Sequence, residues 1–229
     1  MKIIRFFSDK AIDNIGQPAP IKNFLPNWYK EAETTYDSGD GMESPGLKKC
    51  APYMDALLSG YTLVTPVDIF VSKNEDGSLK IGWNGPGEMS DFVSERPKES
   101  GATMPRPAGH FPNHMVWRGF WGINTPRGWS VLMTHPLNRF DLPFTTTSGI
   151  IDSDAFSASG NIPFFIREDF SGVIPAGTPI AQLIPIKRSS WRMVKNDKGQ
   201  WNKEHEQGTQ VRNPETNYKK SMWKRKEYN

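Results

Sequence analysis

The chain has 229 residues, 36% of them hydrophobic and 12% aromatic, which is enough to bury the core of one sizeable domain. Its single cysteine excludes a disulfide framework within the chain. No apolar run reaches the ~18 residues of a membrane span, and the first residues do not resemble a signal peptide. We therefore expect no membrane association and a soluble protein of the cytoplasm.

The first 46 residues are punctuated by proline and glycine and predict an irregular N-terminal arm. Ser44 and Pro45 then supply a helix cap and a first-turn proline. Apolar residues follow at helical spacing, and Gly60 stands where such a helix would end. The pattern predicts one N-terminal helix over residues 47–60.

Beyond Gly60 the pattern changes to the period of two that is typical of strands. Residues 61–72 and 79–83 predict a hairpin around an Asn-Glu-Asp-Gly turn. Residues 115–123 and 129–133 predict a second hairpin. Further strands are expected at 149–151, 162–166 and 180–185. Strands and helices do not alternate, so the sequence predicts a mainly β core.

These patterns divide the chain into an arm (1–46), a β-rich core domain (47–188) and a basic aromatic extension (189–229). The extension carries ten Lys and Arg against five Asp and Glu, together with three Trp and two Tyr. Such a composition suits phosphate contacts and stacking on nucleic acid. A solvated extension that lies against the protein body is the simpler interpretation. We therefore do not expect a nucleic-acid partner.

Two segments of the core carry polar groups at the ends of apolar runs. Ser148–Asp154 places two aspartates after a strand, and Gly177–Ile184 follows a turn and contains a glutamine. Carboxylates at a strand edge require donors, cations or water around them. In this order and separation, the segments resemble the dUTPase and dCTP-deaminase superfamily over about Gly119–Lys187. The resemblance implies a dUTPase-like β-clip or jelly-roll core, here with one N-terminal helix and irregular arms.

The resemblance also implies a nucleotide site. Asp152 matches the family's aspartate that orients a water and contacts the sugar, and Asp154 completes the acidic pair. Gln182 matches the glutamine of the closing strand, which binds phosphate or holds the fold. An ionised carboxylate can accept from a hydroxyl or polarise a water. Two simpler roles remain open, because the aspartates can cap a turn and Gln182 can satisfy a strand end.

The chain departs from the family at three places. Asn138 and Arg139 stand in for the phosphate-binding corner, in a different register. Phe156 lies beside the position of the sugar-stacking tyrosine, and Trp129 flanks the acidic corner as a base-stacking candidate. The Gly-rich motif that closes over the triphosphate is absent. Phosphoryl transfer depends on positioning and charge neutralisation, so we expect a non-hydrolytic nucleotide-binding protein rather than an enzyme.

Several alternatives stay open. The whole chain also resembles an uncharacterised tailed-phage family, through Cys50–Tyr61 and Thr134–Phe144. In a phage, the nucleotide-binding protein would sequester a host nucleotide immune signal in the host cytoplasm, as an anti-defense protein. A virion structural or decoration protein is the second hypothesis. An active nucleoside triphosphate pyrophosphatase that uses Arg139 and tail lysines is the third. By analogy with the dUTPase family we expect a homo-oligomer, namely a trimer.

We expect neither a cofactor nor a metal site. His110 and His114 are four residues apart, which places two imidazoles on one face of a helix. Pro112 and the surrounding strand pattern argue against a helix there. We therefore interpret these histidines as hydrogen-bonded loop residues.

Overall fold

The computed structural model describes residues 2–8, 14–39, 41–85, 92–101, 103–195, 199, 201–203 and 223–229. By internal contacts the chain divides into two units. The β unit comprises Met1–Phe24 and Gly60–Arg188, and the helical unit comprises Leu25–Ser59 and Ser189–Asn229. The chain therefore passes from one unit to the other after Phe24, Ser59 and Arg188.

The β unit is built from antiparallel sheets, and the prediction of a mainly β fold is confirmed. A five-stranded sheet has the order β13 (Gly149–Ile151), β11 (Trp129–Thr134), β16 (Pro179–Lys187), β5 (Tyr61–Val64) and β2 (Ala19–Pro20). A four-stranded sheet has the order β12 (Phe144–Thr146), β14 (Asn161–Ile166), β9 (Met115–Arg118) and β8 (Val93–Glu95). Smaller sheets contain β15 (Gly172–Ile174), β6 (Ile69–Lys73) and β7 (Leu79–Trp83), and β1 (Arg5–Phe7) with β10 (Gly122–Asn124).

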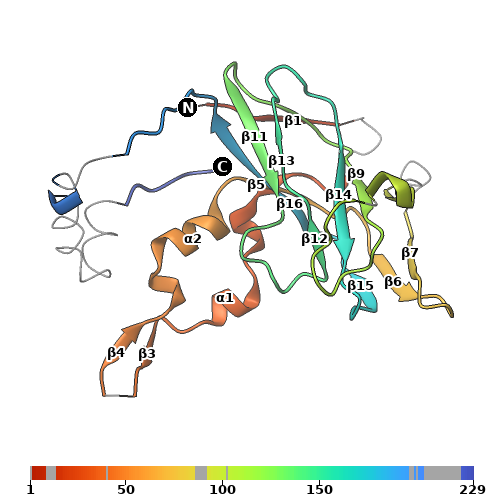
Figure 1. The fold of residues 1–229 in the computed structure, drawn as a ribbon, viewed down its shortest axis with the longest axis horizontal. Coiled ribbons are helices and arrows are strands. Elements are labelled where there is room, and N and C mark those ends of the chain that lie inside the picture. Colours follow the sequence, from red (N-terminus) through yellow and green to blue (C-terminus); the bar gives the residue numbers. More distant parts are fainter. Residues whose placement is uncertain are drawn as a thin grey trace. The chain divides into compact units, whose positions relative to one another are not determined.

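The hydrophobic core of the β unit draws on both large sheets, which lie side by side in Figure 1. Trp117 of β9 is fully buried and stacks on Phe164 of β14, with ring centroids 3.6 Å apart. Along β11 the buried Val131 and Met133 join the same core. Because strand side chains alternate, Ser130 and Thr134 point to the opposite face of β11. At the two ends of β11, Ser130 and Thr134 form hydrogen bonds on that face, with Asp152 and Ser148.

The predicted hairpin of residues 115–123 with 129–133 is wrong. β9 pairs with β8 and β14, whereas β11 pairs with β13 and β16 in the other sheet. After β9 the chain passes through residues 119–121 into β10, which pairs with β1. At Gly119 a Cβ atom would stand 2.6 Å from the carbonyl oxygen of Gly160, so only glycine fits this close backbone approach. Alternation of apolar residues indicates strands but not their partners.

The predicted strand over 61–72 is divided into β5 and β6 by a turn that contains Pro66. The Thr65 N–H donates to the Thr178 carbonyl, and the Thr65 hydroxyl donates to the Pro175 carbonyl. These hydrogen bonds fix the end of β5 to the segment that precedes β16. β6 and β7 form the predicted hairpin, with Ile69 opposite Trp83. The β-strand pattern therefore located this hairpin correctly.

The helical unit contains α1 (Asn27–Glu31), the pair β3 (Thr35–Asp37) and β4 (Glu43–Pro45), and α2 (Ala51–Leu58). A 3₁₀ turn over Leu47–Lys49 precedes α2, so the regular helix is shorter than the predicted 47–60. Two further 3₁₀ turns, Ile21–Phe24 and Lys98–Gly101, belong to the β unit.

In α2, Asp55 accepts hydrogen bonds from Trp223 and Lys226, which ties the end of the extension to this helix. The Trp223 Nε1 to Asp55 Oδ2 distance is 2.9 Å. Among the described residues, no helix is both long and apolar enough to cross a membrane.

Candidate ligand-binding pocket

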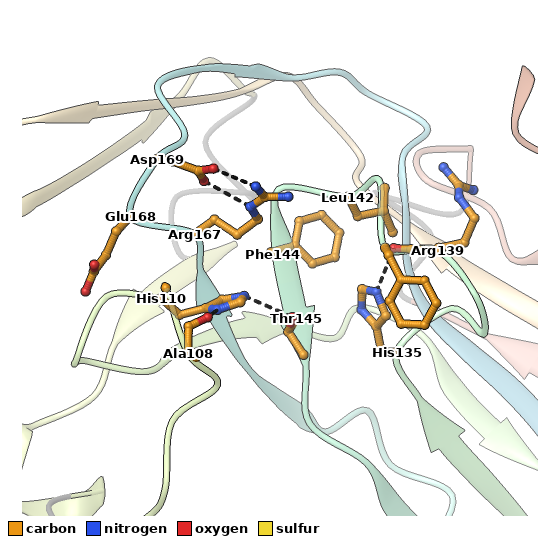
Figure 2. A pocket seen from close by; sticks show the side chains of 12 residues that line it. Ala108, His110, His135, Arg139, Leu142, Phe144, Thr145, Arg167, Glu168 and Asp169 are labelled. Atoms are coloured by element: carbon orange, nitrogen blue, oxygen red, sulfur yellow. Dashed lines mark hydrogen bonds and ion pairs between the residues drawn. The ribbon is translucent and has the colours of Figure 1, made fainter. Parts of the chain in front are cut away.

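A cavity of about 470 Å³ opens in the β unit where three segments meet (Figure 2). Residues 108–110 precede β9, residues 135–145 lead from β11 into β12, and residues 167–169 follow β14. Backbone hydrogen bonds bring them together: the Glu168 N–H donates to Gly109 (2.8 Å) and the Arg167 N–H to Pro143 (3.0 Å). The volume lies within the range of small-molecule sites.

Arg167 lines the cavity, and its guanidinium is held in one orientation by Asp169. Its Nε and Nη2 donate to the two carboxylate oxygens of Asp169 at 2.9 and 2.5 Å. This bidentate contact raises the pKa of Arg167 and lowers the pKa of Asp169. In Figure 2 the guanidinium lies between Asp169 and the ring of Phe144. One edge is therefore fixed by Asp169, while the rest of the guanidinium faces the cavity.

His110 and Thr145 form a hydrogen-bonded pair on the cavity wall. His110 Nδ1 is 3.0 Å from the carbonyl oxygen of Ala108, and Nε2 is 3.0 Å from Thr145 Oγ1. Because a carbonyl only accepts, Nδ1 carries the proton in the neutral ring, and Nε2 accepts from the threonine hydroxyl. These contacts agree with the prediction that His110 is a hydrogen-bonded loop residue.

His135 fastens the start of the second segment to β12. Its Nε2 donates to the Arg139 carbonyl (3.0 Å), and its Nδ1 accepts from the Thr146 N–H (3.3 Å). Burial lowers the pKa of His135, which favours the neutral ring that this pair of contacts requires. The loop over residues 135–139 therefore holds its shape best when His135 is uncharged.

Three predicted site residues lie near the C-terminal end of β11, beside the cavity: Asn138, Arg139 and Gln182. Arg139 lines the cavity, but its guanidinium binds Asp141 and the Phe24 carbonyl, and in Figure 2 it points away from Arg167. Asn138 adopts a φ of 60°, which places it at a turn of the loop. Gln182 is fully buried, and its Oε1 accepts from the Leu137 N–H at 2.8 Å. These contacts support the loop.

The predicted acidic pair lies at the other end of β11, in a group that we call the acidic corner (Gly128, Ser130, Asp152, Asp154 and Arg188). Asp152 accepts from the Ser130 hydroxyl at 2.6 Å and lies 3.1 Å from Arg188. Asp154, whose side chain is only 8% exposed, accepts from Arg188 and from the Gly128 N–H. The Ser130 hydrogen bond and then Arg188 lower the pKa of Asp152, and the Arg188 and Gly128 hydrogen bonds lower that of Asp154 to about 2.

Trp129 and Phe156 also belong to this end. Lys2 Nζ stands 4.9 Å from the centroid of the Trp129 ring, a cation–π contact. Phe156 is 58% exposed, and its N–H donates to the Asp152 carbonyl at 2.9 Å. Ser130 and Thr134 are four residues apart on β11, so the two ends are separated by roughly 13 Å. Within one chain, the predicted residues therefore form two separate groups.

The cavity contains residues that were not among the predicted ligand-binding residues, chiefly Phe140, Thr145 and Arg167. Phe140 is 80% exposed, so its ring is accessible from the cavity. A signal was present in the sequence, because Arg-x-Asp occurs at Arg139–Asp141 and again at Arg167–Asp169. Both pairs form bidentate contacts.

Within the part of the chain that the structure describes, no group of three or more His, Cys, Asp or Glu is placed to hold a metal ion. His114 is half-buried, and its ring is tilted against Phe165 with centroids 6.1 Å apart.

The solved structures that are similar to the chain include two dUTPases. The native dUTPase of EIAV shares 10% sequence identity at a TM-score of 0.34, covering 86% of this chain and 98% of that one. A mutant dUTPase of phage phi11 of S. aureus, with a structural Mg(II) ion, shares 13% identity at a TM-score of 0.29, covering 46% of this chain and 97% of that one. A comparison with protein-family models gave no match, and a comparison with curated proteins gave none. The resemblance to a tailed-phage family stays a prediction.

Proposed function

We propose that the chain binds a nucleotide-type small molecule in the cavity beside β12 and does not hydrolyse it. The observation that carries this proposal is the guanidinium of Arg167, which Asp169 orients and whose remaining edge faces the cavity. A pre-oriented guanidinium is well suited to a phosphate oxygen, because little side-chain freedom is lost on binding.

The rest of the cavity wall suits the other parts of such a ligand. The exposed ring of Phe140 offers an aromatic face to a base. Thr145 and the two histidines supply a hydroxyl and imidazoles beside it. Phe144 and Leu142 add apolar surface. A few polar groups on an otherwise apolar wall are the usual composition of a small-molecule site.

The acidic corner supports binding without hydrolysis. A carboxylate that activates a water must be able to accept its proton. Asp152 is engaged by Ser130 and Arg188, and its pKa is lowered, so it is a weak base. Arg139, which an active pyrophosphatase would use on the triphosphate, is held by Asp141 and Phe24. These contacts favour retention of a ligand over phosphoryl transfer.

Binding without turnover lowers the free concentration of a ligand in proportion to the amount of protein. We therefore extend the proposal to sequestration of a host nucleotide signal. We also propose a homo-oligomer, because Ile150 is 67% exposed on the edge strand β13 and would be covered by a second copy. Light scattering should give a mass of more than one chain; a mass of one chain would contradict this part.

The binding proposal is tested by native mass spectrometry and calorimetry on the full chain. Protein purified from cells that produce the signal should carry a nucleotide, and purified nucleotides should bind saturably. Arg167→Gln should weaken binding by about tenfold, as expected for loss of a charged hydrogen-bond donor. Incubation with magnesium and nucleoside triphosphates should release no pyrophosphate.

Asp152→Asn is the matched control at the acidic corner. It should leave the affinity unchanged, because Asp152 lies at the opposite end of β11 from the cavity. If Asp152→Asn abolishes binding while Arg167→Gln does not, the ligand site is the acidic corner and the proposal is wrong. Pyrophosphate release by the wild-type chain would contradict the non-hydrolytic part.

A further inference from the structure

The charges around the cavity cancel one another. Arg167 pairs with Asp169, Arg139 pairs with Asp141, and Arg106 pairs with Glu168 at 3.1 Å. Of these groups, Arg139, Arg167, Glu168 and Asp169 line the cavity directly. The three guanidinium and three carboxylate groups of this set therefore carry no net charge.

The contacts of His135 add no positive charge to this balance. His135 is neutral by its two hydrogen bonds, and burial lowers its pKa. His110 is engaged by the Ala108 carbonyl and the Thr145 hydroxyl. Sites for triphosphates neutralise the developing and ground-state charges with several cations or metal ions. This cavity instead offers one oriented guanidinium, and a carboxylate already opposes its charge.

From this balance we infer that the cavity selects a nucleotide with a single negative charge, namely a nucleoside cyclic phosphate, over the corresponding triphosphate, and that Asp169 sets this preference. The inference rests on the proposed function, since it names the ligand class of the same cavity. Asp169 opposes the charge of Arg167 while leaving its outer edge to donate. A singly charged phosphodiester accepts from that edge without bringing three further charges near Glu168 and Asp169.

The experiment is a calorimetric panel of one base in four forms: nucleoside, 3′,5′-cyclic phosphate, 5′-monophosphate and 5′-triphosphate. For the wild-type chain at low salt, the cyclic phosphate should bind most tightly and the triphosphate at least about fivefold more weakly, the size expected for one partly exposed charge. The difference should shrink at high salt, because exposed charges are screened.

Two carboxylate variants separate a specific role of Asp169 from a general change of net charge. Asp169→Asn leaves Arg167 without its countercharge, so the preference should shift toward the triphosphate by about fivefold. Asp141→Asn makes the same change of charge beside Arg139, whose guanidinium points away from Arg167, and should leave the order unchanged. Melting temperatures report whether both variants are folded.

The outcomes distinguish the inference from the function on which it rests. If no member of the panel binds, the proposed nucleotide function of this cavity fails. If the wild-type chain binds the triphosphate most tightly, the function stands and the charge inference is overturned. Equal shifts in Asp169→Asn and Asp141→Asn would assign the effect to net charge and overturn the role of Asp169.

Discussion

The two ends of β11 each hold an arginine in a bidentate contact with an aspartate, yet the contacts differ in kind. In the acidic corner, Arg188 and Asp154 are distant in the chain, and Asp154 is only 8% exposed. At the cavity, Arg167 and Asp169 are two residues apart and are 41% and 65% exposed. A long-range contact with a buried carboxylate closes the fold, whereas a local contact between two exposed groups orients one side chain. We therefore propose that the acidic corner contributes to stability and that the cavity recognises the ligand.

The largest expected effect on stability concerns the support of the cavity loop. Gln182→Leu removes the acceptor of the half-buried Leu137 N–H, which should lower the free energy of unfolding by about 1–3 kcal/mol. Chemical denaturation measures this change, and hydrogen exchange at Leu137 should become faster. Unchanged stability together with unchanged protection would show that Gln182 does not hold the loop.

The next effect is a pH dependence of the cavity end. Burial lowers the pKa of His135. As the pH falls, the imidazole is therefore protonated at a higher pH in the unfolded chain than in the folded chain. The contribution of His135 is fully present above about pH 6.5 and is lost as the pH falls toward the folded pKa, by at most about 1.4 kcal/mol per pH unit. His135→Gln should flatten the stability profile between pH 6.5 and 5. A profile with the wild-type slope would refute this role.

The acidic corner should respond at a lower pH. The pKa of Asp154 is lowered to about 2, so its contribution is present above the ordinary carboxyl pKa near 4 and is lost as the pH falls toward 2. Asp154→Asn should lower the melting temperature at pH 7 more than Asp169→Asn does, without changing nucleotide affinity. A larger loss of stability in Asp169→Asn than in Asp154→Asn would contradict the claim that the acidic corner contributes more to stability.

The smallest effect on stability is expected at Phe140. Its ring is 80% exposed, so Phe140→Ser should change the free energy of unfolding by no more than about 0.5 kcal/mol. Affinity for a nucleotide should still fall by about threefold to tenfold if the ring stacks on the base. Equal affinity of the variant and the wild-type chain would remove Phe140 from the site.

Local patterns in the sequence predicted most strands but not how they pair. The runs 149–151, 162–166 and 180–185 coincide closely with β13, β14 and β16, because alternation reports which faces are buried. The placement of β9 and β11 in different sheets depends on close backbone contacts such as that of Gly119 with Gly160. No local sequence pattern encodes such contacts.

The candidate site was predictable only in part for the same reason. Arg139 and Asp152 are both polar residues near strand ends, and nothing in the sequence places them at opposite ends of β11. Arg167 became a candidate only when its contact with Asp169 and its position beside Phe144 were visible. The Arg-x-Asp spacing is a usable signal, although Arg139 shows that it does not state where the guanidinium points.

Hydrogen exchange with and without a bound nucleotide tests the central claim most directly. Saturating ligand should slow exchange at residues 108–110, 135–145 and 167–169, which line the cavity. Exchange at residues 126–130 and 152–156, which form or adjoin the acidic corner, should stay as it is in the free protein. Protection confined to the acidic corner would contradict the account.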